Sequence, residues 1–393
     1  MKIPEKRTNR KRLLLGMGLV LFTIILVVTL DIPVVKARIP QLKLPKLGVK
    51  NVNPQTPDIK QLSQFEWVKL EAAARREGRL TLYSWSWTNT TAAPITSAFA
   101  RRYGIEVDVV AGRGPQFLER LELETRTGNR IGDIMEGAQT HLRNAKLAGF
   151  TVSALDLPVL QSKENWSVSP LSLATEGHVI GYAPYLLSPY INTSLISPSD
   201  EPKSWLDLLQ PRWKGKMVMP NPATSTVPYY LDVLIKNKAI SRDYPSKLAQ
   251  QQLLLSDQTP DSGELLGWGQ ASLSVLNAAP DMIPPLKEGG PIKAIDMEEG
   301  ILSNLLTLSM LKNSPHPNAA KLFLNWLLSP GGQELHSKAK QVGSMLKGKP
   351  DYTPDVFKLT PKKVIPVTAD DGQKIASAFR EKTYVPIFSP VAP

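Results

Sequence analysis

The chain has 393 residues with 42% hydrophobic and 21% charged residues, which is typical of a globular protein and argues against wholesale disorder. It has no cysteine, which excludes a disulfide framework and thiolate metal sites, and only four histidines, from which a histidine-rich metal site is hard to build. The net charge is +12, but residues 1–50 hold 11 Lys or Arg against two acidic residues, so the near-neutral remainder does not indicate nucleic-acid binding.

The N-terminus has the pattern of an export signal. A basic segment at residues 1–12 precedes an uncharged apolar run at residues 13–30. Eighteen helical residues span about 27 Å, close to the hydrocarbon thickness of a bilayer. The positive-inside rule keeps the basic end in the cytoplasm, so we expect a transmembrane or signal-anchor helix that exports the rest of the chain. Small residues near residues 35–37 leave cleavage as a signal peptide open.

A proline-rich linker follows at residues 31–60. It contains five prolines, several lysines and no amphipathic period. Such a segment is either a semi-extended spacer, at up to about 3.1 Å per residue, or a disordered tail, and composition leaves both open.

The body begins near residue 61 and alternates helix and strand patterns up to residue 149. We expect helices at residues 65–77, 91–103 and 115–127 and before Gly149, and strands at residues 80–83, 105–109 and 131–135. This alternation favours a parallel sheet covered on both faces. Ligands of such sheets bind on the loops after the strands, which are residues 84–87, 111–114 and 136–139.

The rest of the body repeats the theme less regularly. The patterns predict strands at residues 179–190, 216–219, 271–276 and 301–311, a short helix at 204–209, a helix through 231 and 235, a longer helical region to about 255, a helix end at 264–270 and a strong helix at 319–328.

Five stretches of this sequence, in order, resemble one known family. They are residues 77–84, 99–107, 127–136, 202–209 with 213–216, and 315–324 with 329–333, and the likeness extends over about residues 66–380. The chain resembles the extracellular solute-binding proteins of bacterial ABC importers, in the branch that includes the ferric-iron-binding proteins.

The resemblance implies an α/β, two-lobed periplasmic-binding-protein-like fold of type II, with hinge strands between the lobes. It implies a first lobe at about 66–182 and 290–335, a second lobe at about 190–285 and a C-terminal segment at 336–393 within the body 61–393. Lobes that meet over a small polar interface close on a ligand by hinge motion, and a permease reads the closed form.

The expected iron ligands are incomplete. In the iron binders of the family, a tyrosine pair follows the strand that ends here at Asn277, but this chain has Ala278 and Ala279 there. The pair Tyr229 and Tyr230 lies on a helix, where packing is its expected role. Glu136 matches an acidic ligand position of the iron binders, and it equally suits pairing with a cationic ligand or a solvated loop charge.

Other candidate ligand-binding residues come from strand-end geometry. The loop after the first strand offers two hydroxyl groups for hydrogen bonds and two indole faces for stacking. An arginine lies in the loop after the second strand, and two hydroxyl residues resemble the second-lobe loop at a helix N-terminus, where anion binding and simple N-capping are both open. The ligand-binding set is Ser84, Trp85, Ser86, Trp87, Arg113, Glu136, Tyr182 at the hinge, Thr224, Ser225 and Asn277.

The sequence therefore predicts an exported solute-binding protein on the extracytoplasmic face of the membrane, with a small-molecule or ion ligand and ABC permease subunits as partners. We expect no cofactor, no bound metal and no enzymatic activity, because none of the four histidines falls on the strand-end loops. A sensory ectodomain with a non-permease partner and an exported enzyme on the same scaffold remain the alternatives.

Overall fold

The computed structural model describes residues 64–87, 89–112, 114–173, 175–257, 259–367 and 383–388. Every described residue belongs to one compact unit of the chain, Thr56–Pro393. The predicted basic segment, apolar helix and linker (residues 1–12, 13–30 and 31–60) lie outside the described residues. Within the described ranges, we find no helix with the length and hydropathy needed to cross a membrane.

The described part is built from alternating helices and strands. The α-helices are α1 (Gln64–Glu77), α2 (Asn89–Tyr103), α3 (Gly114–Thr127), α4 (Gln139–Leu147), α5 (Val227–Lys236), α6 (Tyr244–Ala249), α7 (Thr259–Gly267), α8 (Ala279–Lys287), α9 (Pro317–Leu328), α10 (Pro330–Lys340) and α12 (Val385–Phe388). The strands are β1 (Arg79–Ser84), β2 (Glu106–Ala111), β3 (Ile134–Ala138), β4 (Thr151–Val152), β5 (Ile180–Asn192), β6 (Met217–Pro220), β7 (Leu254–Ser256), β8 (Leu273–Ala278), β9 (Ile292–Ala294), β10 (Ile301–Leu311) and β11 (Val364–Pro366). Short 3-10 helices are η1 (Pro158–Leu160), η2 (Lys163–Asn165), η3 (Trp205–Leu209), η4 (Pro211–Trp213) and η5 (Asp355–Phe357).

One mixed sheet runs through the body in the order β2-β1-β3-β10-β5-β8-β6-β7. The strands β2, β1 and β3 are parallel and form what we call the first half of the sheet. The second half consists of β8, β6 and β7, which are also parallel. Each half therefore presents its own edge of strand carboxyl ends, where ligands of parallel sheets bind.

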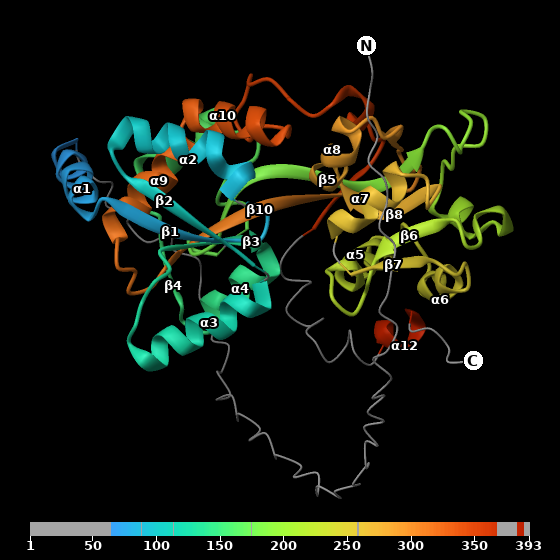
Figure 1. Ribbon diagram of the computed structural model, residues 1–393, viewed down its shortest axis with the longest axis horizontal. Coiled ribbons are helices and arrows are strands. Elements are labelled where there is room, and N and C mark those ends of the chain that lie inside the picture. The colour runs from blue at the N-terminus through green and yellow to red at the C-terminus, as the bar shows by residue number, and fades with distance from the viewer. Residues whose placement is uncertain are drawn as a thin grey trace, which may run out of the picture. The chain divides into compact units, whose positions relative to one another are not determined.

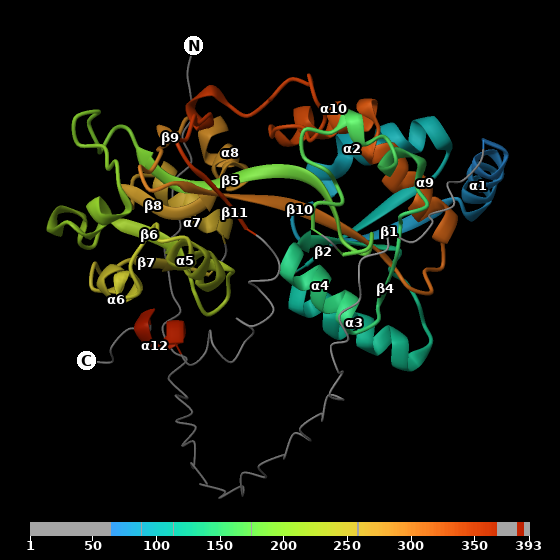
Figure 2. The same cartoon turned by 180° about the vertical axis from the view of Figure 1, so that it is seen from behind.

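Two long antiparallel strands, β5 and β10, join the halves (Figure 1). β10 also pairs with β3 in the first half, and β5 also pairs with β8 in the second half. Seen from behind, the short strands β9 and β11 lie beside these two strands, β9 paired with β5 and β11 with β10 (Figure 2). Nearly every residue of β5 and β10 is buried, which explains why most of their residues are apolar.

Helices cover the first half on both faces, with α2, α9 and α10 on one side and α3 and α4 on the other (Figure 1). The apolar face of α9 supplies much of the core, because Phe323 and Trp326 both contact the ring of Phe99 on α2. The predicted glycine stops are confirmed at Gly78, where the backbone has φ 71°, a conformation that glycine adopts at little cost.

Most predicted elements are confirmed, and β10 occupies the predicted residues 301–311. The longer helical region to about residue 255 is wrong. The helix α6 ends at Ala249, and Gln252 has φ 54°, which breaks the helix. The following strand β7 pairs in parallel with β6, so pairing in the sheet overrides the local helical pattern.

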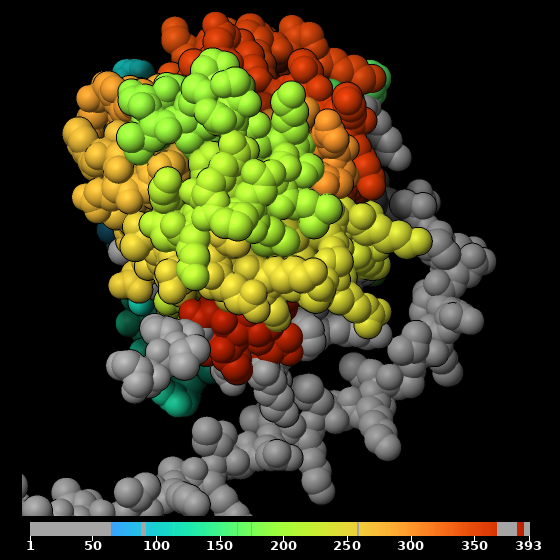
Figure 3. Space-filling view, turned by 90° about the vertical axis from the view of Figure 1, so that its right-hand side faces the viewer, coloured from blue at the N-terminus to red at the C-terminus, as the bar shows by residue number. Residues whose placement is uncertain are grey.

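The C-terminal part of the chain returns to both halves of the sheet. After β11, the described residues resume at 383, and α12 packs against α6. Figure 3 shows this end of the body, with α12 in red beneath the yellow residues. The hydroxyl of Tyr384 donates to the carboxylate of Asp232 on α5, which fastens the segment to the second half.

Candidate functional site

The three strands of the first half are parallel, so their carboxyl ends lie at one edge. Ser84 at the end of β1 lies opposite Ala111 at the end of β2 and opposite Glu136, two residues before β3 ends at Ala138. The predicted meeting of the strand ends at this edge is confirmed, but the predicted loop at residues 136–139 is wrong, because β3 runs to Ala138 and α4 begins directly at Gln139.

Glu136 holds the loop after β1 in place. Its carboxylate is fully buried, and Oε2 accepts hydrogen bonds from Ser84 Oγ at 2.7 Å and from the backbone N–H groups of Trp85 and Ser86, both at 3.0 Å. The other oxygen, Oε1, accepts from Ser86 Oγ at 2.9 Å and from the Tyr182 hydroxyl at 3.0 Å. The interpretation of Glu136 as a solvated loop charge is therefore wrong, because five donors have replaced water around it.

A second layer of buried groups lies behind this loop. Lys340 on α10 donates to the carbonyl of Ser86 at 2.9 Å, and burial lowers the pKa of its amine to about 8 although the Glu136 carboxylate opposes that shift. His336 stacks on Trp87, and burial lowers the pKa of its imidazole to about 3. Both ring nitrogens of His336 lack a hydrogen-bond partner, so the ring acts as a neutral packing group.

The predicted residues of this loop have different exposures. Ser84 and Trp87 are fully buried, as is Tyr182, whose hydroxyl accepts from the Trp87 indole at 3.2 Å. Burial raises the pKa of the Tyr182 phenol well above its usual value, and the negative charge of Glu136 raises it further. Trp85 is 38% exposed and partly faces solvent, whereas Ser86 is half-buried with its hydroxyl bonded to Glu136.

The predicted Arg113 lies outside the described residues, but its neighbour shows where the loop after β2 sits. A Cβ atom on Gly114 would lie 2.2 Å from the ring of His141 on α4. Glycine is thus required for this close approach of the loop to α4.

In the second half, the predicted Thr224 and Ser225 lie in the loop between β6 and α5. The Thr224 hydroxyl donates to the carbonyl of Asp257, and Ser225 Oγ accepts from the Val227 N–H at 3.3 Å. Ser225 thus makes a local turn contact just before α5, whose N-cap is Thr226 and has no side-chain cap bond, so the N-capping role that the sequence left open for Thr224 and Ser225 is wrong.

The predicted Asn277 at the end of β8 is fully buried and bonded within the second half. Its amide donates to the carbonyl of Thr259 at 3.1 Å and its oxygen accepts from Ser274 Oγ at 2.5 Å. Nearby, burial raises the pKa of the Asp281 carboxyl to about 6, and the N–H of Ala278 opposes this shift by donating to it.

Sequence reasoning missed a polar network that joins the two halves. Asn304 on β10 accepts from Gln139 Nε2 at 2.6 Å, and Gln139 is the first residue of α4 in the first half. The amide of Asn304 donates to the hydroxyl of Tyr185 on β5 at 2.8 Å and to that of Tyr230 on α5, in the second half, at 3.3 Å. Gln139 also donates to the carbonyl of Val367 at 2.9 Å.

All four side chains of this network are less than 10% exposed. Tyr230 therefore does more than pack, which was its expected role, because its hydroxyl reaches both Tyr185 and Asn304. Asn304 is one of four polar residues in β10, with Ser303, Thr307 and Ser309, so the sequence of the strand did not single it out.

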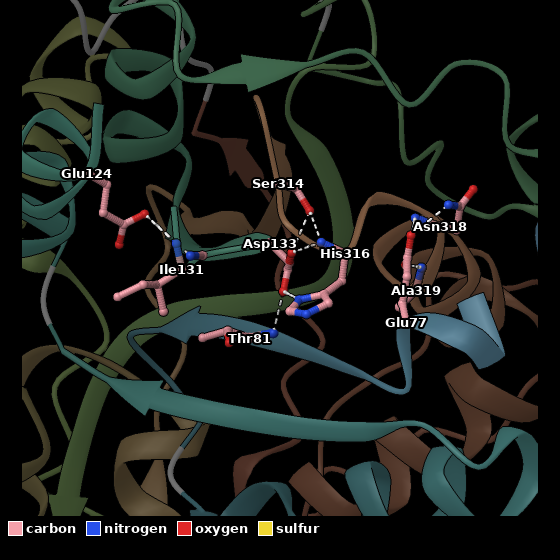
Figure 4. A network of polar contacts seen from close by, with 10 residues as sticks. Glu77, Thr81, Glu124, Ile131, Asp133, Ser314, His316, Asn318 and Ala319 are labelled. Carbon is pink, nitrogen blue, oxygen red and sulfur yellow. Dashed lines mark hydrogen bonds and ion pairs between the residues drawn. The ribbon is translucent and has the colours of Figure 1, made fainter. Parts of the chain in front are cut away.

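A serine, a histidine and an aspartate do meet, but at the opposite edge of the first half (Figure 4). Asp133 accepts from His316 Nδ1 at 2.9 Å and from Ser314 Oγ at 2.5 Å. A catalytic triad needs the serine bonded to the free nitrogen of the histidine, whereas this serine donates to the carboxylate. Asp133 also accepts from the Thr81 N–H at 2.7 Å, so the group joins the start of β1 to the loop before α9.

Other potential sites are weaker. A pocket of about 510 Å³ lies between the loop before η3, the strand β9 and the segment around η5, and none of its lining residues comes from the strand-end loops. Its charges pair with one another, as Lys293 does with Glu201 at 2.8 Å. Among the described residues, no three acidic or histidine side chains gather as a metal site.

Comparison of the sequence with known proteins found a matching family and a relative. A family model described as bacterial extracellular solute-binding protein matches residues 80–339. An uncharacterized protein of Haemophilus influenzae is 24% identical over 284 residues, which is 68% of this chain and 77% of that protein.

Solved structures share the fold. Iron-bound HitA from Pseudomonas aeruginosa is 21% identical with a TM-score of 0.61, and the match covers 79% of this chain and 99% of that one. The ferric binding protein from Campylobacter jejuni is 19% identical with a TM-score of 0.63, over 79% and 98% of the two chains. AfuA from Actinobacillus pleuropneumoniae, with exogenous fructose-6-phosphate bound, is 20% identical with a TM-score of 0.61, over 78% and 96%. The fold is thus the mixed-sheet α/β fold of periplasmic binding proteins.

Proposed function

The chain belongs to the bacterial extracellular solute-binding proteins, and on that premise we propose that it captures a small polar solute between the two halves of its sheet and delivers it to an ABC importer permease. We assign the first lobe to about residues 66–182 and 290–335 and the second lobe to about residues 190–285. In this assignment β5 and β10 are the hinge strands, and no covalent chemistry takes place.

The observation that carries this proposal is the position of Asn304. It lies on a strand that crosses between the halves, and it is bonded to Gln139 from the first half and Tyr230 from the second. Because Asn304 is hydrogen-bonded from both sides, the lengths of its bonds depend on the distance between the halves. A ligand that binds both halves would act on the same contacts and shift the open–closed balance.

The ligand class follows from the groups near the strand ends. Trp85 offers a partly exposed indole face and Ser86 a half-buried hydroxyl, a combination that suits stacking and hydrogen bonding to a hydroxylated solute. We propose a neutral or anionic polar solute of this kind, bound between these residues and the loop that carries Thr224 and Ser225.

Ferric iron is a poor fit to these groups. Phenolate ligands need an ionised tyrosine, but burial raises the pKa of the Tyr185 phenol well above its usual value, and the neighbouring Tyr230 adds to this shift. Glu136 is occupied by five donors and is not free to bind a cation.

We further propose that the body is held at the extracytoplasmic face of the cell membrane by the apolar helix at residues 13–30. The support is the sequence: a basic segment, an apolar run of bilayer length and a proline-rich linker precede the body.

A thermal-shift screen tests the function. The purified chain is melted with sugars, phosphorylated vitamins, phosphonates, polyamines and ferric iron. A specific ligand at about 100 times its dissociation constant adds about 2.7 kcal/mol to the free energy of unfolding. We expect a shift with a hydroxylated or phosphorylated solute that is lost in N304A. A tyrosine-dependent colour with ferric iron would refute the ligand class, and a positive screen whose shift N304A leaves intact would refute the site.

A further inference from the structure

The helix α1 presents a solvent face of unusual composition. Its seven exposed residues are all neutral or basic: Gln64, Phe65, Val68, Lys69, Ala72, Arg75 and Arg76. Phe65 is 66% exposed and Val68 is 57% exposed. The opposite face, with Leu70 and Ala74, is buried against α9, so the helix is already anchored without these outward apolar groups.

The acidic residues of α1 are all half-buried rather than exposed. Glu71 pairs with Arg75 at 2.8 Å, and Glu77 accepts from the backbone N–H groups of Asn318 and Ala319 at the start of α9 (Figure 4). Glu66 is half-buried. The outward face therefore combines apolar side chains with Lys69 and Arg76, and with Arg75, whose charge is paired with Glu71.

The basic surface continues onto neighbouring elements. Arg75 donates to the carbonyls of Tyr103 and Arg102 at the end of α2, which places the exposed Arg101 and Arg102 beside α1. Arg79 at the start of β1 is also exposed, and Glu106 lies opposite it in the sheet. Figure 1 shows α1 at the outer end of the first half, and it lies at the edge opposite the strand-end loops.

Exposed phenylalanine and valine among arginines and lysine suit one occupant, an anionic lipid surface. Apolar side chains enter the headgroup region, and basic side chains are attracted to anionic lipids. The chain outside the described residues supports this occupant. The apolar run ends at residue 30, and the 33 residues between it and α1 span at most about 110–120 Å, so the proposed tether keeps α1 within reach of the bilayer surface.

We propose that the outward face of α1, defined by Phe65, Val68, Lys69, Ala72, Arg75 and Arg76, docks the folded body onto the anionic surface of the membrane that carries its tether. This inference rests on the proposed tether at residues 13–30. Docking by this edge leaves the strand-end loops on the other edge free to take up solute.

The absence of cysteine allows a direct test. The full chain carrying V68C is labelled with an environment-sensitive fluorophore and inserted into nanodiscs of phosphatidylcholine with phosphatidylglycerol, or of phosphatidylcholine alone. The matched control is L206C on η3 in the second half, where Leu206 is 61% exposed. We expect a blue shift for the V68C probe in anionic nanodiscs, none in neutral nanodiscs and none for L206C.

High salt and a charge-neutralising variant test whether the docking is electrostatic. The shift should disappear at about 1 M salt, where the Debye length falls to about 3 Å. Neutralising two basic residues in K69Q/R76Q should lower the ratio of docked to undocked chains about 30-fold, since each basic residue near an anionic surface contributes a factor of about five.

Three outcomes would overturn the proposal. The first is an unshifted V68C probe in chains that stay with anionic nanodiscs. The second is a salt-insensitive shift in both lipids, which indicates another cover such as a second copy of the chain. The third is a chain that does not remain with nanodiscs at all, which removes the tether, while solute binding is judged separately by the thermal-shift screen.

Discussion

Replacing Glu136 by glutamine should loosen the loop after β1 and weaken solute binding. The substitution keeps the shape of the side chain. Its carbonyl oxygen can take the place of Oε2 and keep the donors Ser84 Oγ, Trp85 N–H and Ser86 N–H. Its amide then faces the hydroxyls of Ser86 and Tyr182, which can accept instead.

The loss is that of the negative charge. A hydrogen bond to a charged group contributes about 1.5–3 kcal/mol and a neutral one about 0.5–1.5 kcal/mol. Five bonds change class and Lys340 loses a compensating charge, but such contributions are not additive. We therefore expect E136Q to lower the free energy of unfolding by about 2–4 kcal/mol, or the melting temperature by about 5–10 °C.

Hydrogen exchange of the peptide that contains Trp85 and Ser86 separates a local effect from a global one. A matched control is E124Q, because Glu124 is also buried and accepts from the N–H groups of Ile131 and Gly132 at the opposite edge of the first half. Both variants should melt earlier. Only E136Q should expose the Trp85 and Ser86 amides, about tenfold for each 1.4 kcal/mol of lost protection.

Equal exchange of that peptide in E136Q and E124Q would refute the role of Glu136 as the group that fixes this loop. So would unchanged exchange together with a normal melting temperature in E136Q.

Three further predictions concern buried polar groups. Burial lowers the pKa of Lys340 to about 8, so between about pH 8 and 10 the unfolded chain binds more protons than the folded one. The melting temperature should therefore rise with pH over this range, and K340M should abolish the rise. An equal rise in K340M would contradict the assignment of this titration to Lys340. Burial raises the pKa of Asp281 to about 6, so between about pH 4 and 6 the folded state keeps a proton that the unfolded state loses, and stability falls as the pH rises. In chemical denaturation, the free energy of unfolding of D281N should exceed that of the wild type by about 1–3 kcal/mol at pH 7 and match it at pH 4. N304A should lose about 3 kcal/mol and the ligand-induced melting shift, whereas N192A, whose buried side chain bonds within the second half, should lose stability alone; a ligand shift that survives in N304A would count against a site shared by the halves.

Much of the fold was predictable because it depends on local patterns. Alternating helices and strands, glycine stops such as Gly78 and the apolar run of β10 all carry their signal within a few residues. The error before residue 255 has the opposite origin, because β7 has three residues and exists through its pairing with β6. Short strands such as β4, β9 and β11 depend on partners far along the chain in the same way.

The position of the candidate site at a sheet edge was predictable from the sequence, but the roles of its residues were less so. Register between parallel strands brings Ser84, Ala111 and Glu136 to one level, and the sequence order alone implies this. Whether Glu136 meets solvent, ligand or protein depends on the donors that surround it, and Tyr182 comes from a strand 46 positions away. The contact between Asn304 and Tyr230 spans 74 positions and leaves no local pattern.

The contacts of Glu136 and those of Asn304 would play different parts in the hinged receptor that we propose. The bonds of Glu136 to the loop after β1 and to Tyr182 lie on the side of the sheet that we assign to the first lobe, so rotation about β5 and β10 should leave that loop intact. The bonds of Asn304 reach α4 on one side and α5 on the other, so a rotation that separates the halves must stretch at least one of them. Stretching a buried hydrogen bond without a replacement costs about 1–3 kcal/mol. A solute that binds Trp85 and the loop around Thr224 together would favour the same arrangement of the halves as these bonds, and the affinity of the protein should therefore fall in N304A even if the solute never touches Asn304.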